Sequence, residues 1–240
     1  MPLPSIATPT YEIELPSLKK TVQYRPFLVK EEKLLVLALE SEDTKNITTA
    51  IKTVLKNCVK TRGVKVEQLP TFDIEYLFLN IRAKSVGEEV ELNIIAPDDG
   101  VTEIPVTIDI DDIKVQEDPT HTRQIKINDE LMIEMKYPSL DEFIKNNFDF
   151  NTNEVGIEKS FELIATCIDK IYSEDEVWAT ADVSKKEVIE FLEQMNSQQF
   201  KAIEHFFTTM PKLTHTIKVK NPKTKKESNV VLEGLASFFA

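Results

Sequence analysis

Two cysteines and three histidines are the side chains best suited to metal binding or nucleophilic catalysis, and their spacing favours neither. Cys58 and Cys167 stand 109 residues apart, whereas a structural zinc site places paired ligands within a few residues of each other. Both lie in apolar helical patterns, so we interpret them as buried thiols of a reducing compartment. His121, His205 and His215 belong to no HExxH or GxSxG motif. These residues therefore predict no catalytic site, and we expect the chain not to be an enzyme.

The aspartates offer the one alternative that involves chemistry. Asp98, Asp99, Asp109, Asp111 and Asp112 could serve a cation-dependent enzyme if several of them converged on one metal ion. A calcium-binding EF-hand loop also needs a glycine and a glutamate at fixed positions, and no glycine follows the stretch Asp109-Ile-Asp-Asp112. Isoleucines interrupt it with the alternation of a strand. We interpret these carboxylates as solvated and keep the enzyme as the least favoured alternative.

Composition excludes several other classes of function. The chain has five glycines among 240 residues, and no two are closer than 13 positions, which excludes the glycine-rich loops that bind nucleotides. We expect no cofactor. A net charge of −12 argues against a nucleic-acid partner, because phosphates require a basic face. No apolar run approaches the ~20 residues of a membrane span.

The N-terminus and the periodicity indicate where the chain lies and where it is helical. Met1–Thr10 lacks the basic start and apolar run of a signal peptide, so we expect a cytoplasmic protein. Apolar residues recur at i, i+3 and i+4 within Lys30–Glu40, Asp43–Thr61 and Thr71–Lys84, and again within Glu154–Ile171. Further helix starts are indicated by two capping boxes, Ser139-x-x-Glu142 and Ser184-x-x-Glu187, and by Ser197 as the cap of a last helix that Pro211 terminates.

Between these helices the hydrophobic period changes to two. Alternation from about 88 to 137 predicts four strands in one antiparallel sheet, and Thr214–Lys220 with Glu227–Leu232 predicts a hairpin. We expect an α+β fold in which helical N-terminal and C-terminal parts surround a small antiparallel β-sheet insertion, followed by a C-terminal β-hairpin. The expected segments are an extended arm (1–27), N-terminal helices (28–86), an antiparallel β domain (87–137), C-terminal helices (138–211) and a β-hairpin with an apolar tail (212–240).

Two segments carry more apolar surface than a small monomer easily buries. Leu34–Leu39 is apolar on nearly all sides, which is typical of a helix that is buried or covered by a partner. The tail contains Leu235, Phe238 and Phe239, which either dock on their own domain or enter a groove of a partner. The residues alone leave both readings open.

The expected junction between helix and strand is a further candidate contact. It contains Arg82, Lys84 and Glu88 around Ser85 and Gly87. Glycine permits a turn that other residues resist, and the polar side chains could satisfy loose backbone groups there. The alternative is that Arg82, Lys84 and Glu88 contact a partner at the rim of the sheet.

Several phrases of the sequence together resemble a known family. The most specific is Arg82-Ala-Lys-Ser-Val-Gly-Glu88. The others are Tyr24-Arg-Pro-Phe27, Lys30-Glu-Glu-Lys-Leu-Leu35, Phe72-Asp-Ile-Glu-Tyr-Leu-Phe78, Tyr137-Pro-Ser139, Asn221-Pro222 and Leu232-Glu-Gly-Leu235. Over roughly residues 20–240 the chain resembles the baseplate hub assembly protein family of T-even-type tailed bacteriophages.

The resemblance implies a non-enzymatic role. Members are similar to assembly factors that help build the central hub of the phage baseplate, some of them acting as chaperones. Hub proteins would then be the partners, and the host cytoplasm the place of action during virion assembly. The alternative is a permanent structural subunit of the hub, and self-association stays open. The resemblance transfers no catalytic residue and no metal.

Overall fold

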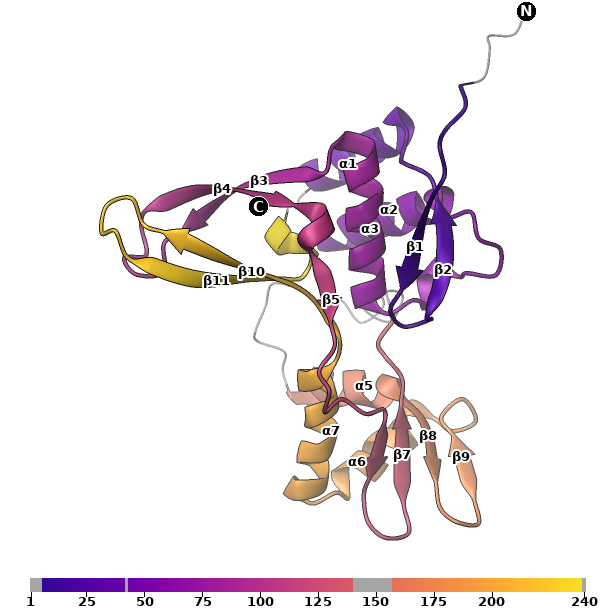
Figure 1. The fold of residues 1–240 in the computed structure, drawn as a ribbon. Helices are drawn as coiled ribbons and strands as arrows, with labels where there is room; N and C mark the ends of the chain where they lie inside the picture. Colours follow the sequence, from indigo (N-terminus) through magenta and orange to yellow (C-terminus); the bar gives the residue numbers. More distant parts are fainter. Residues whose placement is uncertain (1–5, 42, 140–156, 239–240) are drawn as a thin grey trace, which may run out of the picture. The chain divides into compact units, whose positions relative to one another are not determined.

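The computed structural model describes residues 6–41, 43–139 and 157–238, and it confirms an α+β fold (Figure 1). The chain divides into two compact units. Unit 1 contains residues 1–116 together with 212–240, and unit 2 contains residues 117–211. Unit 1 is therefore built from both ends of the sequence. The five consecutive segments expected from the sequence did not anticipate that the first and last parts of the chain form one unit.

Three helices form one part of unit 1: α1 (Val29–Glu40), α2 (Thr44–Cys58) and α3 (Thr71–Val86). Asp43 begins α2 by accepting the N–H groups of Lys45 and Asn46. Helix α3 carries apolar residues on most sides, and seven of them are buried. A helix without a polar face belongs in a protein interior, and α3 contacts α2, β1, β5 and β10.

The N-terminal segment forms a hairpin, so the extended arm expected for residues 1–27 is wrong for residues 11–24. Strands β1 (Tyr11–Leu15) and β2 (Lys20–Tyr24) are antiparallel, with Ile13 opposite Val22. Alternate residues of both strands are buried, which is the period of a half-buried sheet. The turn is fixed to α3 because the fully buried carboxylate of Asp73 accepts the N–H and the hydroxyl of Ser17. Burial raises the pKa of Asp73, and the bonds from Ser17 oppose that rise.

Two longer hairpins pack face to face in the remainder of unit 1. One consists of β3 (Glu89–Ile95) and β4 (Glu103–Asp109), and the other of β10 (Lys212–Lys220) and β11 (Glu227–Glu233), as expected for the C-terminus. Figure 1 shows the two hairpins running to a common tip. Ala96, Ile104 and Val219 are buried between them.

A buried asparagine joins the turns of these two hairpins. Asn221 is 1% exposed, and its side-chain amide donates to Asp98 (3.0 Å) and Asp99 (2.9 Å). Its carbonyl oxygen accepts the N–H of Lys223 within its own turn. The hydroxyl of Thr224 adds a bond to Asp98. One side chain thus holds both turns, which explains why an asparagine is required at this point.

The single four-stranded sheet expected within residues 87–137 does not form. Strands β3 and β4 pair only with each other, and β5 (Lys114–Gln116) joins β10. Strands β6 (Gln124–Lys126) and β7 (Met132–Met135) belong to unit 2. Alternation reveals which face of a strand is buried but not which strand lies beside it. The four strands were therefore located correctly and form two hairpins, β3 with β4 and β6 with β7, but they do not join into one sheet.

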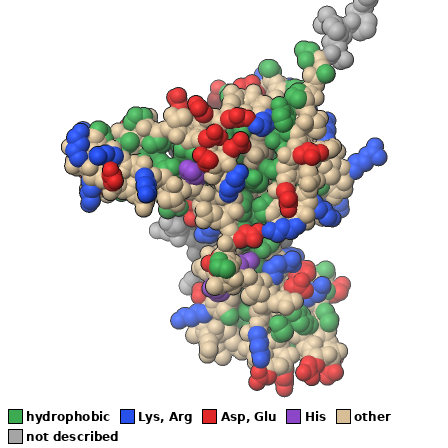
Figure 2. Space-filling view, viewed as in Figure 1, with side chains coloured by type: hydrophobic (Ala, Val, Ile, Leu, Met, Phe, Trp, Pro, Cys, Tyr) green, Lys and Arg blue, Asp and Glu red, His purple; other side chains and the backbone are tan. Residues whose placement is uncertain are grey.

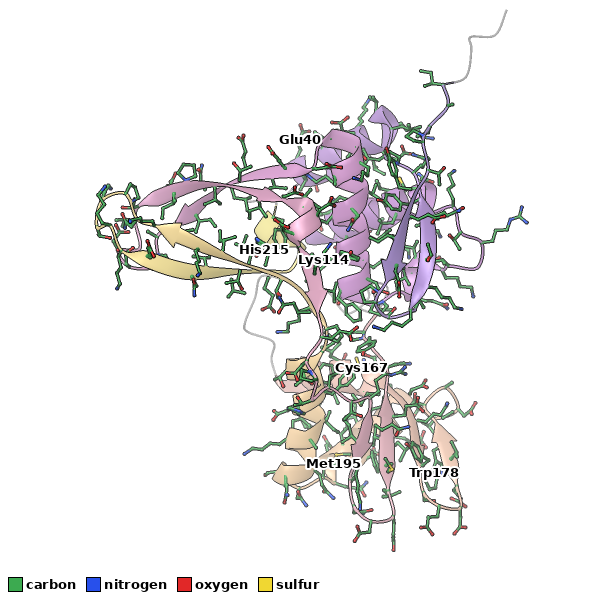
Figure 3. The ribbon with its side chains drawn as sticks, viewed as in Figure 1. Glu40, Lys114, Cys167, Trp178, Met195 and His215 are labelled. Atoms are coloured by element: carbon green, nitrogen blue, oxygen red, sulfur yellow. The ribbon has the colours of Figure 1, made fainter. Side chains whose placement is uncertain are left out.

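Unit 2 combines one antiparallel sheet, in the order β6-β7-β8-β9, with three described helices. The further elements are α5 (Ile157–Cys167), β8 (Ile168–Tyr172), β9 (Val177–Ala179), α6 (Lys185–Glu193) and α7 (Ser197–Thr209). Its core contains Ile133, Met135, Cys167 and Phe206, all at most 1% exposed. Cys167 lies at the end of α5, and Trp178 lies on β9 (Figure 3).

Two expectations for unit 2 need correction, and one is confirmed. The helix expected over Glu154–Ile171 ends at Cys167, and Ile168 begins a strand whose apolar residues mimic a helical face. Asn196, not Ser197, caps α7. The capping box of Ser184 and Glu187 is confirmed. The helix expected after Ser139-x-x-Glu142 lies outside the described residues.

Replacing Asn221 tests the joint between the two hairpins. We expect Asn221→Ala to lower the free energy of unfolding by about 1–3 kcal/mol, because it removes the buried side chain whose hydrogen bonds join the two turns. The matched control is Asn229→Ala on the same hairpin, where the side chain is exposed and the expected loss is within about 0.5 kcal/mol. Urea unfolding followed by circular dichroism measures both, and equal losses would contradict the role of Asn221.

Candidate protein-binding surfaces

Helix α1 exposes most of its apolar side chains. Within it only Glu31 and Ala38 are buried. The exposed fractions are 79% for Val29, 36% for Leu34, 48% for Val36, 54% for Leu37 and 60% for Leu39. Of the two readings open from the sequence for Leu34–Leu39, burial inside the fold is wrong. The remaining interpretation is that a partner covers these apolar side chains, whose exposure to water is unfavourable.

A buried ion pair determines which face of α1 turns outward. Arg25 follows β2, and its Nη2 donates to Oε1 of Glu31 at 3.0 Å, with the two residues only 8% and 1% exposed. Oε2 of Glu31 accepts the N–H of Leu28 at 2.8 Å, where α1 begins. Since Glu31 is turned inward, Ala38 seven residues later lies on the same buried face. Leu34 and Leu35 lie on the side of Glu31 and Ala38, whereas Val36 and Leu37 lie on the opposite side and must then face solvent.

The buried guanidinium group of Arg25 has hydrogen-bond acceptors around it in addition to the carboxylate of Glu31. Nη1 of Arg25 donates to the carbonyl of Pro26 at 2.8 Å and lies 3.8 Å from the sulfur of Cys58. Burial alone would raise the pKa of Glu31, but the bonds from Arg25 and Leu28 hold it below its ordinary value. Burial also raises the pKa of Cys58 to about 11. Cys58 is therefore an inert protonated thiol, and both cysteines are buried, as expected, and form no disulfide.

The junction between α3 and β3 has a largely structural explanation. Gly87 ends α3 with φ of 149°, a conformation that side chains with a Cβ rarely adopt. The hydroxyl of Ser85 donates to the carbonyl of Ile81 and accepts the N–H of Phe27, which ties β2 to α3. Lys84 forms an ion pair with Glu88 one turn later and lies 5.8 Å above the ring of Tyr11.

The three candidate residues of that junction differ in exposure. Glu88 is exposed, whereas Lys84 and Arg82 are half-buried. Burial lowers the pKa of Arg82. The structure therefore brings Lys84 and Glu88 together at the surface and draws Arg82 partly inward. Contact of these side chains with a partner stays a prediction.

The C-terminal tail docks, at least in part, on its own unit. Phe238 ends a short 3₁₀ helix (Leu235–Phe238) and is completely buried, in a cluster with Leu79, Ala83 and Leu213. Phe239 lies outside the described residues, and the side chain of Leu235 is not described either. Binding of Phe238 to a partner would require the tail to leave this cluster. The tail's role in binding therefore stays a prediction.

Lysines gather at the tip of the joined hairpins, where Figure 2 shows a basic cluster. Lys220, Lys223, Lys225 and Lys226 are all exposed. Beneath them, hydrogen bonds from Thr224 and Asn221 lower the pKa of Asp98, and bonds from Thr102 do the same for Asp99. These two carboxylates thus remain ionised and have hydrogen-bond donors of their own. The tip of the two hairpins is therefore a basic surface of unit 1, separate from the apolar surface of α1.

Three of the five carboxylates considered for a cation site, those of Asp98, Asp99 and Asp109, accept structural hydrogen bonds. Asp109 accepts the N–H of Asp111 at the start of the 3₁₀ helix Ile110–Asp112, while Asp98 and Asp99 lie in the turn before β4. Within residues 6–41, 43–139 and 157–238, no three histidine, cysteine or acidic side chains are grouped as a metal site requires. Over these same ranges, every helix is too short or too polar to cross a bilayer.

The sequence did not reveal a hydrogen-bonded histidine in unit 2. The hydroxyl of Thr209 donates to the carbonyl of His205 at 2.6 Å, so it must accept the N–H from Nδ1 of His121 at 2.9 Å. Nε2 of His121 is then free to accept the hydroxyl of Tyr137 at 3.0 Å. Burial lowers the pKa of His121. The signal that could have found this cluster, a histidine with an aromatic partner sixteen residues later, is too weak to recognise.

Comparison with known families places these surfaces in context. The family described as T4 bacteriophage base plate protein matches residues 8–240. The chain belongs to this family. No curated protein and no solved structure was found to match it. The resemblance to phage baseplate proteins is thus confirmed, and other proteins of the phage baseplate are partners of this baseplate protein.

Replacing Phe238 measures how much the tail of this baseplate protein contributes to the stability of the hydrophobic core. We expect Phe238→Ala to cost about 3–5 kcal/mol, as for other fully buried phenylalanines. The control is Val231→Ala on the neighbouring strand β11, 59% exposed, with an expected cost below about 1 kcal/mol. Thermal and urea unfolding of the full chain give both values. A loss near zero for Phe238→Ala would show that the tail is dispensable for folding.

The neutral His121 makes unit 2 sensitive to acid. Its pKa is lower in the folded chain than the ordinary value of about 6.5, so the unfolded chain binds the proton more readily. The stability is fully present above about pH 6.5 and declines as pH falls from there toward the folded pKa. Fluorescence of Trp178, the one tryptophan, reports urea unfolding of unit 2. We expect His121→Gln to flatten this pH dependence and the control His215→Gln, in unit 1, to leave it unchanged.

Proposed function

We propose that this chain is a non-catalytic assembly factor for the central hub of the phage tail baseplate, acting by binding other baseplate proteins in the host cytoplasm during virion assembly. The observation that carries the proposal is the apolar surface of α1. Five exposed large apolar side chains on one helix cost free energy in water and gain it when another protein covers them. Membership of the baseplate family supplies the kind of partner.

The rest of unit 1 supports a binding role because it presents α1 on a fixed frame. The ion pair of Arg25 and Glu31 sets the rotation of the helix, and α2 packs against its inner side. A preformed surface binds with less loss of conformational entropy than one that must first be ordered. The hairpin tip adds exposed lysines at another place on the same unit.

A capture experiment tests the proposal. Tagged wild-type chain expressed in infected host cells should retain baseplate hub proteins, detected individually by immunoblot. We expect Leu39→Glu to reduce that capture at least tenfold, because a contact worth about 1.5–3 kcal/mol is replaced by a charge. The control Val231→Glu changes a side chain of nearly equal exposure, 59% against 60%, outside α1, and should leave capture unchanged.

Two outcomes would overturn parts of the proposal. Capture of hub proteins by neither the wild type nor the control would remove the hub as the partner. A permanent structural subunit is the alternative, and quantitative mass spectrometry of purified virions decides between them. We expect the chain to be absent or far below the copy number of the hub subunits. Equal copy number would favour the permanent subunit.

A further inference from the structure

The outermost face of α1 has a composition that a second copy of the chain would complement. Val29, Lys33, Val36, Leu37 and Glu40 follow the series i, i+4, i+7, i+8 and i+11, which places them along one stripe of the helix. This stripe lies opposite the buried face that contains Glu31 and Ala38. Its apolar members are 48–79% exposed. The stripe is therefore an unoccupied surface with apolar residues at its centre.

The two charges of this stripe are arranged so that they cannot satisfy each other. Lys33 and Glu40 are two turns apart, or roughly 10.5 Å along the axis, which exceeds the reach of an ion pair. Neither forms an ion pair within the part of the chain that the structure describes, and both are exposed. Figure 3 marks Glu40 on unit 1. Each therefore has an unused charge beside an exposed apolar residue.

An antiparallel partner helix with the same sequence resolves both features. Lys33 and Glu40 lie at equal distances, three and a half residues, on either side of the midpoint between Val36 and Leu37. A two-fold axis through that midpoint places Lys33 of each helix against Glu40 of the other. It also packs Val36 of each helix on Leu37 of the other. A parallel pair would instead oppose lysine to lysine and glutamate to glutamate.

We propose that two copies of this chain form a reversible dimer through antiparallel contact of their α1 helices, with the two-fold axis between Val36 and Leu37. Both copies use the same patch, so the contact closes and does not propagate. The apolar side chains supply the affinity, and the two exposed ion pairs fix the direction. The dimer covers the same face of α1 that the proposed function assigns to other baseplate proteins, so the two contacts exclude each other on one helix, but the dimer does not require those proteins.

The length of α1 limits the strength of this dimer. A helix of twelve residues is about 18 Å long, so one helix pair buries less than the roughly 1,200–2,000 Å² of a stable interface. We therefore expect dissociation in the micromolar range, with monomer at low concentration and dimer at high concentration. Flanking leucines, Leu34 and Leu39, enlarge the contact on its two sides.

Sedimentation velocity of the full chain over about 1–200 µM tests the proposal, since a monomer of 27.5 kDa is well separated from its dimer. We expect Lys33→Glu and Glu40→Lys each to weaken dimerisation about tenfold, because each places two like charges on either side of the axis. The double variant Lys33→Glu/Glu40→Lys should return to within about threefold of the wild type. The control Val231→Glu should not change the dissociation constant.

Mixing the two single variants gives the sharpest readout. In a mixed pair, every lysine of one chain faces a glutamate of the other, so the mixture should dimerise more strongly than either variant alone. A wild type that stays monomeric at the highest concentration would overturn the proposal. So would a dimer that is insensitive to both single changes, or variants whose mixture shows no gain. Capture of hub proteins is measured separately, so its failure would leave the dimer standing.

Discussion

The buried ion pair between Arg25 and Glu31 is the constraint on which the surface of this protein depends. A charge removed from water must be paired, and breaking such a pair costs about 3–5 kcal/mol. Glu31 can reach Arg25 in only one rotation of α1, and its other oxygen accepts the N–H of Leu28, the residue that caps the start of that helix. Hydrophobic burial alone would favour turning Val36 and Leu37 inward. The ion pair prevents this, and these two side chains face solvent.

Elsewhere in unit 1, too, single polar side chains join separate structural elements. Asp73 fixes the β1–β2 turn to α3, Ser85 fixes the chain after β2 to the same helix, and Asn221 joins the two long hairpins. Each is a polar group in a largely buried position, where an unmade hydrogen bond would be costly. These groups hold hairpins that would be marginal by themselves around one apolar helix. A frame fixed in this way can display an apolar surface without collapsing onto it.

Sequence periodicity and turns predicted most helices and strands and the hairpin of β10 with β11, but not the pairings between strands distant in sequence. The α2 pattern succeeded because Asp43 caps it and its apolar face is buried, both local properties. Pairing of β5 with β10 joins residues nearly a hundred positions apart, and no local signal specifies it. Ile168 and Ile171 continued a helical period by coincidence, although a strand begins there. The ion pair of Arg25 and Glu31 was equally hidden, because spacing says nothing of burial.

The phrases that carry the family resemblance coincide mostly with side chains that hold the chain together. Arg25, Phe72, Gly87 and Asn221 are buried, hydrogen-bonded or bound to a special backbone conformation. Such residues identify a fold, because few substitutes satisfy the same geometry. The outward residues Val36, Leu37 and Leu39 of α1 fall outside these phrases and remain exposed among the residues that the structure describes. The resemblance therefore reflects residues that stabilise the fold, whereas the binding surface that we propose lies on the face of α1 that the Arg25–Glu31 pair turns outward.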